Sequence, residues 1–283
     1  MALSITPGAA SAATTSDPEL KVMSWNVQRG NCSSHVDPQV MANRIDAISQ
    51  AHAVTVFGLQ EIHIDQVQRV RDQLATTSGV PYYYKFGPTS CGDTRGNAII
   101  SRYTITDSVF QPYAALNQAW DDNGEKRAAV GVKIAREGRR VWIFTTHLTV
   151  KGGADTGPAP VRARQAIELR NLADRYSTAP VRTIVTGDFN DRPSGDQVGV
   201  DDAYFEMHQH YSDTWGAWAN RTGTPDKAGY TAPTSSPDRR IDYIWMNYNS
   251  MLGVTSSGVL QSTFSSDHFP LITRFAVWCD GCA

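Results

Sequence analysis

Apolar residues recur along the chain with two different spacings, which predict an alternation of strands and helices. In the first third, alternating or unbroken apolar runs mark strands, and apolar residues three and four apart mark helices. Asp37 and Pro38 are typical of a helix start, because a carboxylate caps the first amides and proline fits the first turn. The predicted order is strand, helix, strand, helix, strand, over residues 20–27, from 37 onward, 53–59, 64–75 and from 82 onward.

The middle and the end of the chain are dominated by strands joined by short turns, a pattern that predicts antiparallel meanders. A helix over 160–176 and a strand over 181–186 separate the two meanders. Two halves that each end in sheet suggest two sheets packed face to face with helices outside. The predicted meander strands are 96–101, 105–111, 127–135, 139–146, 241–247, 251–260 and 269–277.

The 283 residues, 41% of them hydrophobic, contain no linker that would divide the chain. We therefore expect one domain over residues 20–283. Residues 1–19 are small and polar, and we interpret them as a disordered segment. Within it, Ala10-Ser11-Ala12 resembles the end of a signal peptide, so a secreted protein is expected. No apolar stretch is long enough for stable membrane insertion, and we expect a monomer.

Four cysteines form an even set, which is typical of disulfide bonds in a secreted protein. We expect the pairs Cys32 with Cys91 and Cys279 with Cys282. The alternative for the C-terminal Cys-x-x-Cys is half of a zinc site, but no second such pair exists in the sequence.

The charge balance gives no sign of a tight nucleic-acid binder, because 26 basic and 28 acidic residues give a formal net charge of -2. A phosphate-bearing substrate would have to be held locally. Arginines close to the motifs described next are candidates for that role, namely Arg95, Arg102, Arg127, Arg239 and Arg240.

Most of the informative polar residues follow apolar, strand-like runs, which would place them together at the rim of a buried sheet. Carboxylates and carboxamides suit a hard metal ion, and imidazoles transfer protons, so the set predicts a hydrolytic site. The set comprises two carboxamides, four carboxylates and two histidines: Asn26, Asn190, Glu61, Asp188, Asp242, Asp267, His147 and His268.

Two of these residues are expected to act as a hydrogen-bonded pair. Asp242 lies one strand before His268 in an antiparallel neighbourhood, and a carboxylate bonded to an imidazole fixes its tautomer and raises its basicity. His147 would be the second imidazole. The other five histidines lack such a context and are interpreted as surface residues: His35, His52, His63, His208 and His210.

Taken together, the motifs resemble those of the endonuclease/exonuclease/phosphatase superfamily, which includes pancreatic-type deoxyribonucleases, apurinic endonucleases, bacterial sphingomyelinases and inositol polyphosphate 5-phosphatases. The resemblance spans residues 20–277 and rests on six motifs in the family's order. It implies a four-layer α/β sandwich with two mixed, largely antiparallel sheets between helices. It also implies hydrolysis of a phosphate ester with a divalent metal, usually Mg²⁺, with Mn²⁺ or Ca²⁺ as alternatives. The motifs end in Asn26, Glu61, Leu148, Asn190, Tyr243 and His268.

Carried over by position, the resemblance assigns three residues to the metal. Glu61 would be the principal ligand, with Asn26 supporting it or the phosphate, and Asp267 would be a further carboxylate on the metal side.

The same resemblance assigns five residues to the chemistry. Asp188 and Asn190 would orient the attacking water and the phosphate. His268, with Asp242 as its partner, would contact the phosphate or activate water. His147 would be the general acid or a phosphate-stabilising imidazole, and the general base stays open between Asp188 and His268.

The substrate phosphate would be approached by Arg127, and Arg95 is a second candidate. The chain departs from the deoxyribonuclease pattern at Thr94-Arg95, where those enzymes have a glutamate that supports the histidine at the position of His147. Either Asp93 takes that role, or the histidine is held differently.

We interpret the chain first as a secreted, metal-dependent phosphodiesterase that cleaves DNA by in-line attack of water. The alternatives are a phosphomonoesterase or lipid phosphodiesterase acting on an inositol phosphate or sphingomyelin, and a catalytically inactive binding or toxin-associated module. Occupied catalytic positions argue against the inactive module. Substrate choice is expected to lie in the loops 28–38, 86–95, 111–125, 151–160 and 211–240.

Overall fold

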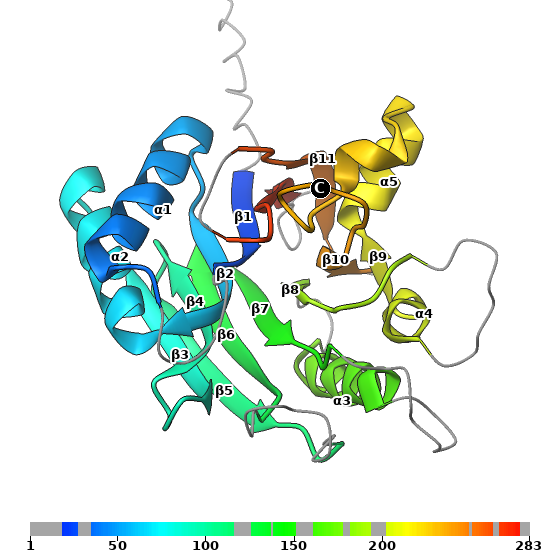
Figure 1. Ribbon diagram of the computed structural model, residues 1–283, viewed down its shortest axis with the longest axis horizontal. Helices are drawn as coiled ribbons and strands as arrows, with labels where there is room; N and C mark the ends of the chain where they lie inside the picture. The colour runs from blue at the N-terminus through cyan, green and yellow to red at the C-terminus, as the bar shows by residue number, and fades with distance from the viewer. Residues whose placement is uncertain are drawn as a thin grey trace, which may run out of the picture.

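The computed structural model describes residues 19–27, 35–115, 126–136, 138–150, 161–177, 182–193, 202–248, 251–262 and 266–277. Within these ranges the chain forms two six-stranded sheets packed face to face, with helices on both outer sides (Figure 1). The four-layer α/β sandwich implied by the family resemblance is confirmed. The expected N-terminal segment and the C-terminal cysteine pair lie outside the described residues.

The first sheet has the strand order β11-β12-β1-β2-β4-β3. Its parallel pair among the described strands is β1 with β2, and the others pair antiparallel. The strands are β1 Glu19–Asn26, β2 Val56–His63, β3 Tyr83–Ser90, β4 Arg95–Ser101, β11 Leu252–Val259 and β12 Leu271–Val277.

The second sheet repeats this plan with the order β5-β6-β7-β8-β10-β9. Here β7 and β8 are the parallel pair within the described strands. Each sheet therefore carries one central parallel pair, whose two strands end at the same edge. The strands are β5 Ile105–Pro112, β6 Ala128–Arg136, β7 Arg139–His147, β8 Arg182–Asp188, β9 Tyr211–Asp213 and β10 Asp242–Asn247.

Helices cover the outer faces of both sheets. The pair α1 and α2 packs on the first sheet, and α3 and α4 pack on the second, at the opposite side of the molecule in Figure 1. Asp37 caps α1 as the sequence predicted, with its carboxylate accepting the amides of residues 39 and 40. The helices are α1 Pro38–His52, α2 Ile64–Ser78, α3 Val161–Tyr176, α4 Ala203–His208, α5 Thr214–Thr222 and the 3₁₀ turn η1 Asp226–Gly229. In the described part of the chain, no helix is both long and apolar enough to cross a bilayer.

Three apolar clusters fill the spaces between the layers. The middle cluster joins the facing sides of the two sheets, and the other two lie beneath the helices. Strand β1 supplies two of them, since Leu20 and Val22 point into the sandwich while Met23 and Trp25 point toward α1 and α2. The sheets approach each other closely at Gly58, where an added Cβ would lie 2.0 Å from the Thr186 hydroxyl oxygen.

Two predictions about the periphery were wrong. The segment 211–240, predicted as loop, contains β9, α5 and η1. Trp215 and Ala219 of α5 enter the core between the sheets, so this segment closes part of the sandwich. His63, predicted at the surface, is buried and stacks on His35 with ring centroids 4.1 Å apart.

The predicted disulfide at Cys91 has partial support. Cys91 takes part in a disulfide bond, and the structure describes no free cysteine. Cys32 lies outside the described residues, so the pairing of these two cysteines stays a prediction.

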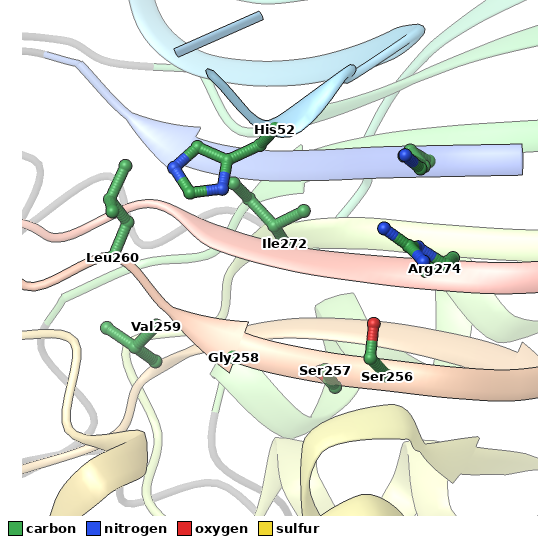
Figure 2. Close-up of a pocket in the computed structure, with 9 residues that line it drawn as sticks. His52, Ser256, Ser257, Gly258, Val259, Leu260, Ile272 and Arg274 are labelled. Atoms are coloured by element: carbon green, nitrogen blue, oxygen red, sulfur yellow. The ribbon is translucent and has the colours of Figure 1, made fainter.

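A pocket of about 280 Å³ opens on the outer side of the first sheet, between β1, β11, β12 and the end of α1 (Figure 2). Lys21 and Arg274 face each other across the β1–β12 ladder and would repel. The Glu19 carboxylate lies 4.0 Å from the Lys21 ammonium and 3.5 Å from the Arg274 guanidinium. One local carboxylate therefore already offsets part of the positive charge of this pocket.

Candidate active site

The ends of the two parallel strand pairs bring the candidate residues to one edge of the sandwich. Asn26 ends β1 and Glu61 lies near the end of β2, on one sheet. His147 ends β7 and faces Asp188, the last residue of β8, on the other sheet. Asp242 begins β10 and pairs with Asp188 in the antiparallel ladder. Since carboxyl ends of parallel neighbours share an edge, the topology assembles the site from both sheets.

Glu61 reaches the site through an irregular turn of β2. The register with β4 shifts between Leu59 and Ile62, and Glu61 adopts a left-handed φ of 55°. A bulge of this kind re-aims a side chain out of the strand alternation, at a backbone cost of about 1–3 kcal/mol. Its neighbour Gln60 instead points between the sheets, where its amide nitrogen donates to the Thr145 hydroxyl over 2.8 Å.

Asn26 links the two sheets through carboxylates. Its side-chain nitrogen donates to Glu61 Oε1 over 2.9 Å and to Asp188 Oδ2 over 3.1 Å. Arg95 adds a charge from the side, with Nη1 3.4 Å from Glu61 Oε2. Asn26 thus holds one carboxylate from each sheet close together, an arrangement that carries excess negative charge.

His268 is fixed at both its ring and its backbone. Its Nδ1 lies 2.8 Å from Asp242 Oδ2, and its carbonyl accepts the indole N–H of Trp25 over 2.9 Å. The Ser266 hydroxyl accepts a hydrogen bond from the backbone amide of His268 and donates one to the carbonyl of Asn26. These two bonds connect this segment to β1. Neither Trp25 nor Ser266 was predicted from the sequence to belong to the site.

The two histidines are driven to opposite protonation states. Burial alone would lower the pKa of His268, but the carboxylates of Asp242 and Asp188 outweigh it and raise that pKa to about 10. Burial holds the pKa of His147 well below its usual range, and the positive charges of Arg127, His268 and Arg95 lower it further. Near neutral pH, His268 is therefore an imidazolium and His147 a neutral imidazole.

His147 is supported by Asn190 rather than by the loop residue Asp93, whose side chain is exposed. The Asn190 amide nitrogen lies 3.0 Å from His147 Nε2 and donates to the carbonyl of Leu148 over 3.0 Å. Asn190 has a left-handed φ of 51°, and its backbone amide donates to Asp188 Oδ1 over 2.9 Å. The side chains of Asp188 and Asn190 therefore both approach Nε2 of His147.

Asp188 is the centre of the cluster. Its Oδ2 lies 3.5 Å from His147 Nε2 and 3.6 Å from His268 Nε2. Burial raises the pKa of Asp188 to about 7; His268, Asn26 and the Asn190 amide oppose that rise, while Asp242 adds to it. A buried carboxyl whose pKa lies near neutrality is suited to take up a proton during a reaction.

The donor set fits a hard divalent cation. Oxygens of Asp188 and Asp242 and a ring nitrogen of His268 all lie within 4.8 Å of one another, and a cation bound through that nitrogen would require a neutral His268. Asp242 Oδ1 is buried and has no hydrogen-bond partner among the described residues. Buried carboxylate oxygens without enough positive partners are what Mg²⁺, Mn²⁺ or Ca²⁺ requires of a protein.

Three further predicted residues lie around this cluster. Asp267 is half-buried, and its charge helps to raise the pKa of His268, but no hydrogen bond or ion pair described in the structure joins its side chain to the cluster. Arg95 and Arg127 are both buried, and their charges act on each other and on His147. Arg127 is therefore not a solvent-exposed surface arginine.

Comparison with known proteins identifies the family. The model of the Endonuclease/Exonuclease/phosphatase family matches residues 23–268, which include every residue of the cluster. The chain belongs to this family. Its biochemical class is therefore that of a phosphoesterase. Among curated protein sequences, none matches the chain.

Solved structures of the same fold cover nearly the whole chain. The endonuclease/exonuclease/phosphatase from Beutenbergia cavernae DSM 12333 has a TM-score of 0.68 and 24% identity, over 92% of this chain and 72% of its own. The mannosyl-6-phosphatase Bt3783 of Bacteroides thetaiotaomicron VPI-5482 has a TM-score of 0.68 and 19% identity, and the match covers 90% of this chain and 99% of the phosphatase. TDP2 of D. rerio, complexed with a single-strand DNA product, has a TM-score of 0.62 and 18% identity, and the match covers 92% of this chain and 99% of the TDP2 chain.

Proposed function

We propose that this protein is a secreted, Mg²⁺-dependent phosphodiesterase that hydrolyses DNA. The observation that carries the proposal is the placement of two imidazoles of opposite protonation state against one buried carboxyl, Asp188, at 3.5 and 3.6 Å. Such a site provides a proton acceptor, a fixed positive charge and a neutral hydrogen-bond donor within one small volume. Those are the elements that attack of water on a phosphate ester needs.

Each side chain has a separate task in the proposed reaction. Asp188 orients the attacking water and takes its proton as the new bond from oxygen to phosphorus forms. The His268 imidazolium, kept charged by Asp242, stabilises negative charge on the phosphoryl oxygens. The neutral ring of His147 accepts the Asn190 amide at Nε2, which keeps the ring in place, and its donor is Nδ1, 3.7 Å from Glu61 Oε1. The bond from phosphorus to the leaving oxygen breaks, and the product alcohol takes its proton from solvent.

The cation would be held by Glu61 as principal ligand, with Asn26 in support and Asp267 as a further carboxylate. The buried Asp188, Asp242 and His268 group lies beside this position and adds to the negative potential that attracts a cation. When bound, Mg²⁺ supplies positive charge that draws electron density from the non-bridging and leaving oxygens. Arg95 and Arg127 would contact the same phosphate from the side of β4 and β6.

DNA is the proposed substrate because the similar fold of D. rerio TDP2 is described with a single-strand DNA product. The second candidate is a phosphomonoesterase acting on a phosphorylated sugar or inositol, which the similarity to a mannosyl-6-phosphatase favours. Export is supported by the disulfide bond at Cys91, since such bonds persist in oxidising compartments.

The test is nicking of supercoiled plasmid by the purified protein in Mg²⁺, with and without EDTA, beside the His268→Ala variant. We expect nicking that EDTA abolishes, and a loss of roughly 10²-fold or more in the variant. Nicking that is equal in EDTA would refute the role of the metal. A folded protein that leaves plasmid intact but releases phosphate from a sugar phosphate would establish the second candidate instead.

A further inference from the structure

A second pocket, of about 270 Å³, lies beside the candidate active site. Arg192 on its rim is two residues beyond Asn190, and Arg239 is three residues before Asp242. Extended chain advances about 3.3 Å per residue, so these arginines lie within roughly 7–10 Å of site residues along the backbone. The pocket is therefore an extension of the catalytic edge.

The floor of the pocket is rigid. The guanidinium of Arg240 lies 4.9 Å from the ring centre of Trp215 and 4.9 Å from that of Tyr243. It also forms a buried ion pair with Asp213. Because Asp213 already balances the charge of Arg240, the floor gives the pocket shape rather than a free positive charge.

The rim is charged and loosely held. The Arg192 and Arg239 guanidiniums share one carboxylate, Asp238, at 3.9 and 3.7 Å. Their side chains are 61% and 40% exposed, so these ion pairs are weak and easily exchanged. Asp226 also lines the pocket and offsets part of the charge, so recognition would rest on the bidentate geometry of two guanidiniums rather than on net charge.

One wall carries an aromatic ring. Tyr230 is half-buried and lines the same pocket as the two rim arginines. A planar ring beside two guanidiniums suits a nucleotide, whose base stacks on the ring while its phosphate meets the positive charge.

We propose that this pocket binds a further nucleotide of the cleaved DNA strand, one that does not flank the scissile bond, with its phosphate on Arg192 and Arg239 and its base against Tyr230. The proposal rests on the proposed function and names a polymer rather than a monoester as the substrate. The phosphate on Arg192 and Arg239 would be one close to the scissile phosphate on the same strand.

The experiment compares three substrates in Mg²⁺: bis(p-nitrophenyl) phosphate, a thymidine dinucleotide and a thymidine octanucleotide. The variants are Arg192→Ala, Arg239→Ala and their double, with Arg71→Ala as the matched control. Arg71 is an arginine in an ion pair on α2, in the outer layer over the first sheet, 2.7 Å from Asp72. Removing it changes the net charge equally but leaves the pocket intact.

For the octanucleotide we expect kcat/KM to fall about tenfold in each pocket variant, chiefly through KM, as one charged hydrogen bond is lost. The salt dependence should weaken by ~0.7 in logarithmic slope for a lost single-strand phosphate contact. The small diester, the dinucleotide and the Arg71 control should be unaffected.

Equal losses on the octanucleotide and the small diester would overturn the subsite, because they would show a structural role. Unchanged octanucleotide kinetics in the double variant would also overturn it. If the native protein cleaves no diester, the proposed function fails by itself. The subsite is then tested by fluorescence anisotropy of a labelled octanucleotide in EDTA, where an equal Kd for native protein and double variant would overturn it.

Discussion

Replacing Asp242 by Asn tests whether the buried carboxylate is what keeps His268 charged. The change preserves side-chain size and leaves an oxygen that can accept from His268 Nδ1, which lies 2.8 Å from Asp242 Oδ2. It removes the largest of the three negative charges that raise the pKa of His268 to about 10. Asp188, with its Oδ2 3.6 Å from His268 Nε2, stays as the other partner.

The size of the effect follows from the charge that is lost. One opposite charge at hydrogen-bond distance shifts a pKa by about 1–3 units, equivalent to about 1.4–4 kcal/mol. A histidine with a raised folded-state pKa contributes stability that is fully present below its unfolded pKa of about 6.5 and is lost as pH rises through the folded pKa. In metal-free protein the native chain should therefore lose this contribution between about pH 6.5 and 10, and the Asn variant should lack a large part of it at neutral pH.

The assay is urea unfolding at several pH values in EDTA, together with NMR titration of the His268 ring. The matched control is Asp174→Asn, because Asp174 forms an exposed pair with His210, 2.7 Å apart. That exposed pair should contribute less than about 1 kcal/mol. A His268 pKa that is unchanged in the Asp242 variant, or equal stability losses in the two variants, would refute the reasoning.

Three further outcomes are expected. His147→Gln should reduce kcat about 10²-fold or more with unchanged circular dichroism, and near-native activity in a folded variant would remove His147 from the mechanism. Mg²⁺ at about 100 times its Kd should stabilise the native protein by about 2.7 kcal/mol, measured by thermal unfolding, and Glu61→Gln should lose most of that gain; an equal gain would place the cation elsewhere. Gly58→Ala should destabilise by about 1–3 kcal/mol because its Cβ would lie 2.0 Å from the Thr186 hydroxyl oxygen, and adding Thr186→Ala should restore part of the loss; full stability in Gly58→Ala would show that the sheets separate freely.

Alternation and spacing of apolar residues located most of the regular elements, because those elements bury one or both faces against a neighbouring layer. Strand β1 is an example, with successive residues entering different apolar clusters. Helix α5 was missed because Thr214–Thr222 is short, contains Gly216, and begins with Asp213 as a side-chain cap that also reads as turn composition. Its two tryptophans signalled packing, but no periodic pattern long enough to predict a helix surrounds them.

The candidate site was accessible from sequence only as a set of residue types at strand ends. The bulge at Glu61 has no local sequence signal, and at Asn190 the signal is weak, since asparagine adopts a left-handed conformation more readily than most residues but does not require it. Those two turns decide which atoms meet, and they make Asn190 rather than Asp93 the support of His147. The roles of Trp25 and Ser266 depend on contacts more than 200 positions apart in the chain, which a single sequence does not reveal.

The repeated plan of the two sheets explains why the site lies where it does. Each sheet offers one parallel pair, and the ends of β1 and β2 face the ends of β7 and β8 across the sandwich. Asn26 closes the gap by donating to a carboxylate of each sheet. A hard cation between these carboxylates would relieve the repulsion between them. The residues that repel each other in the metal-free protein would therefore supply the affinity for Mg²⁺. Stability and activity should therefore respond together to the cation, which is why the Glu61→Gln variant is expected to lose both.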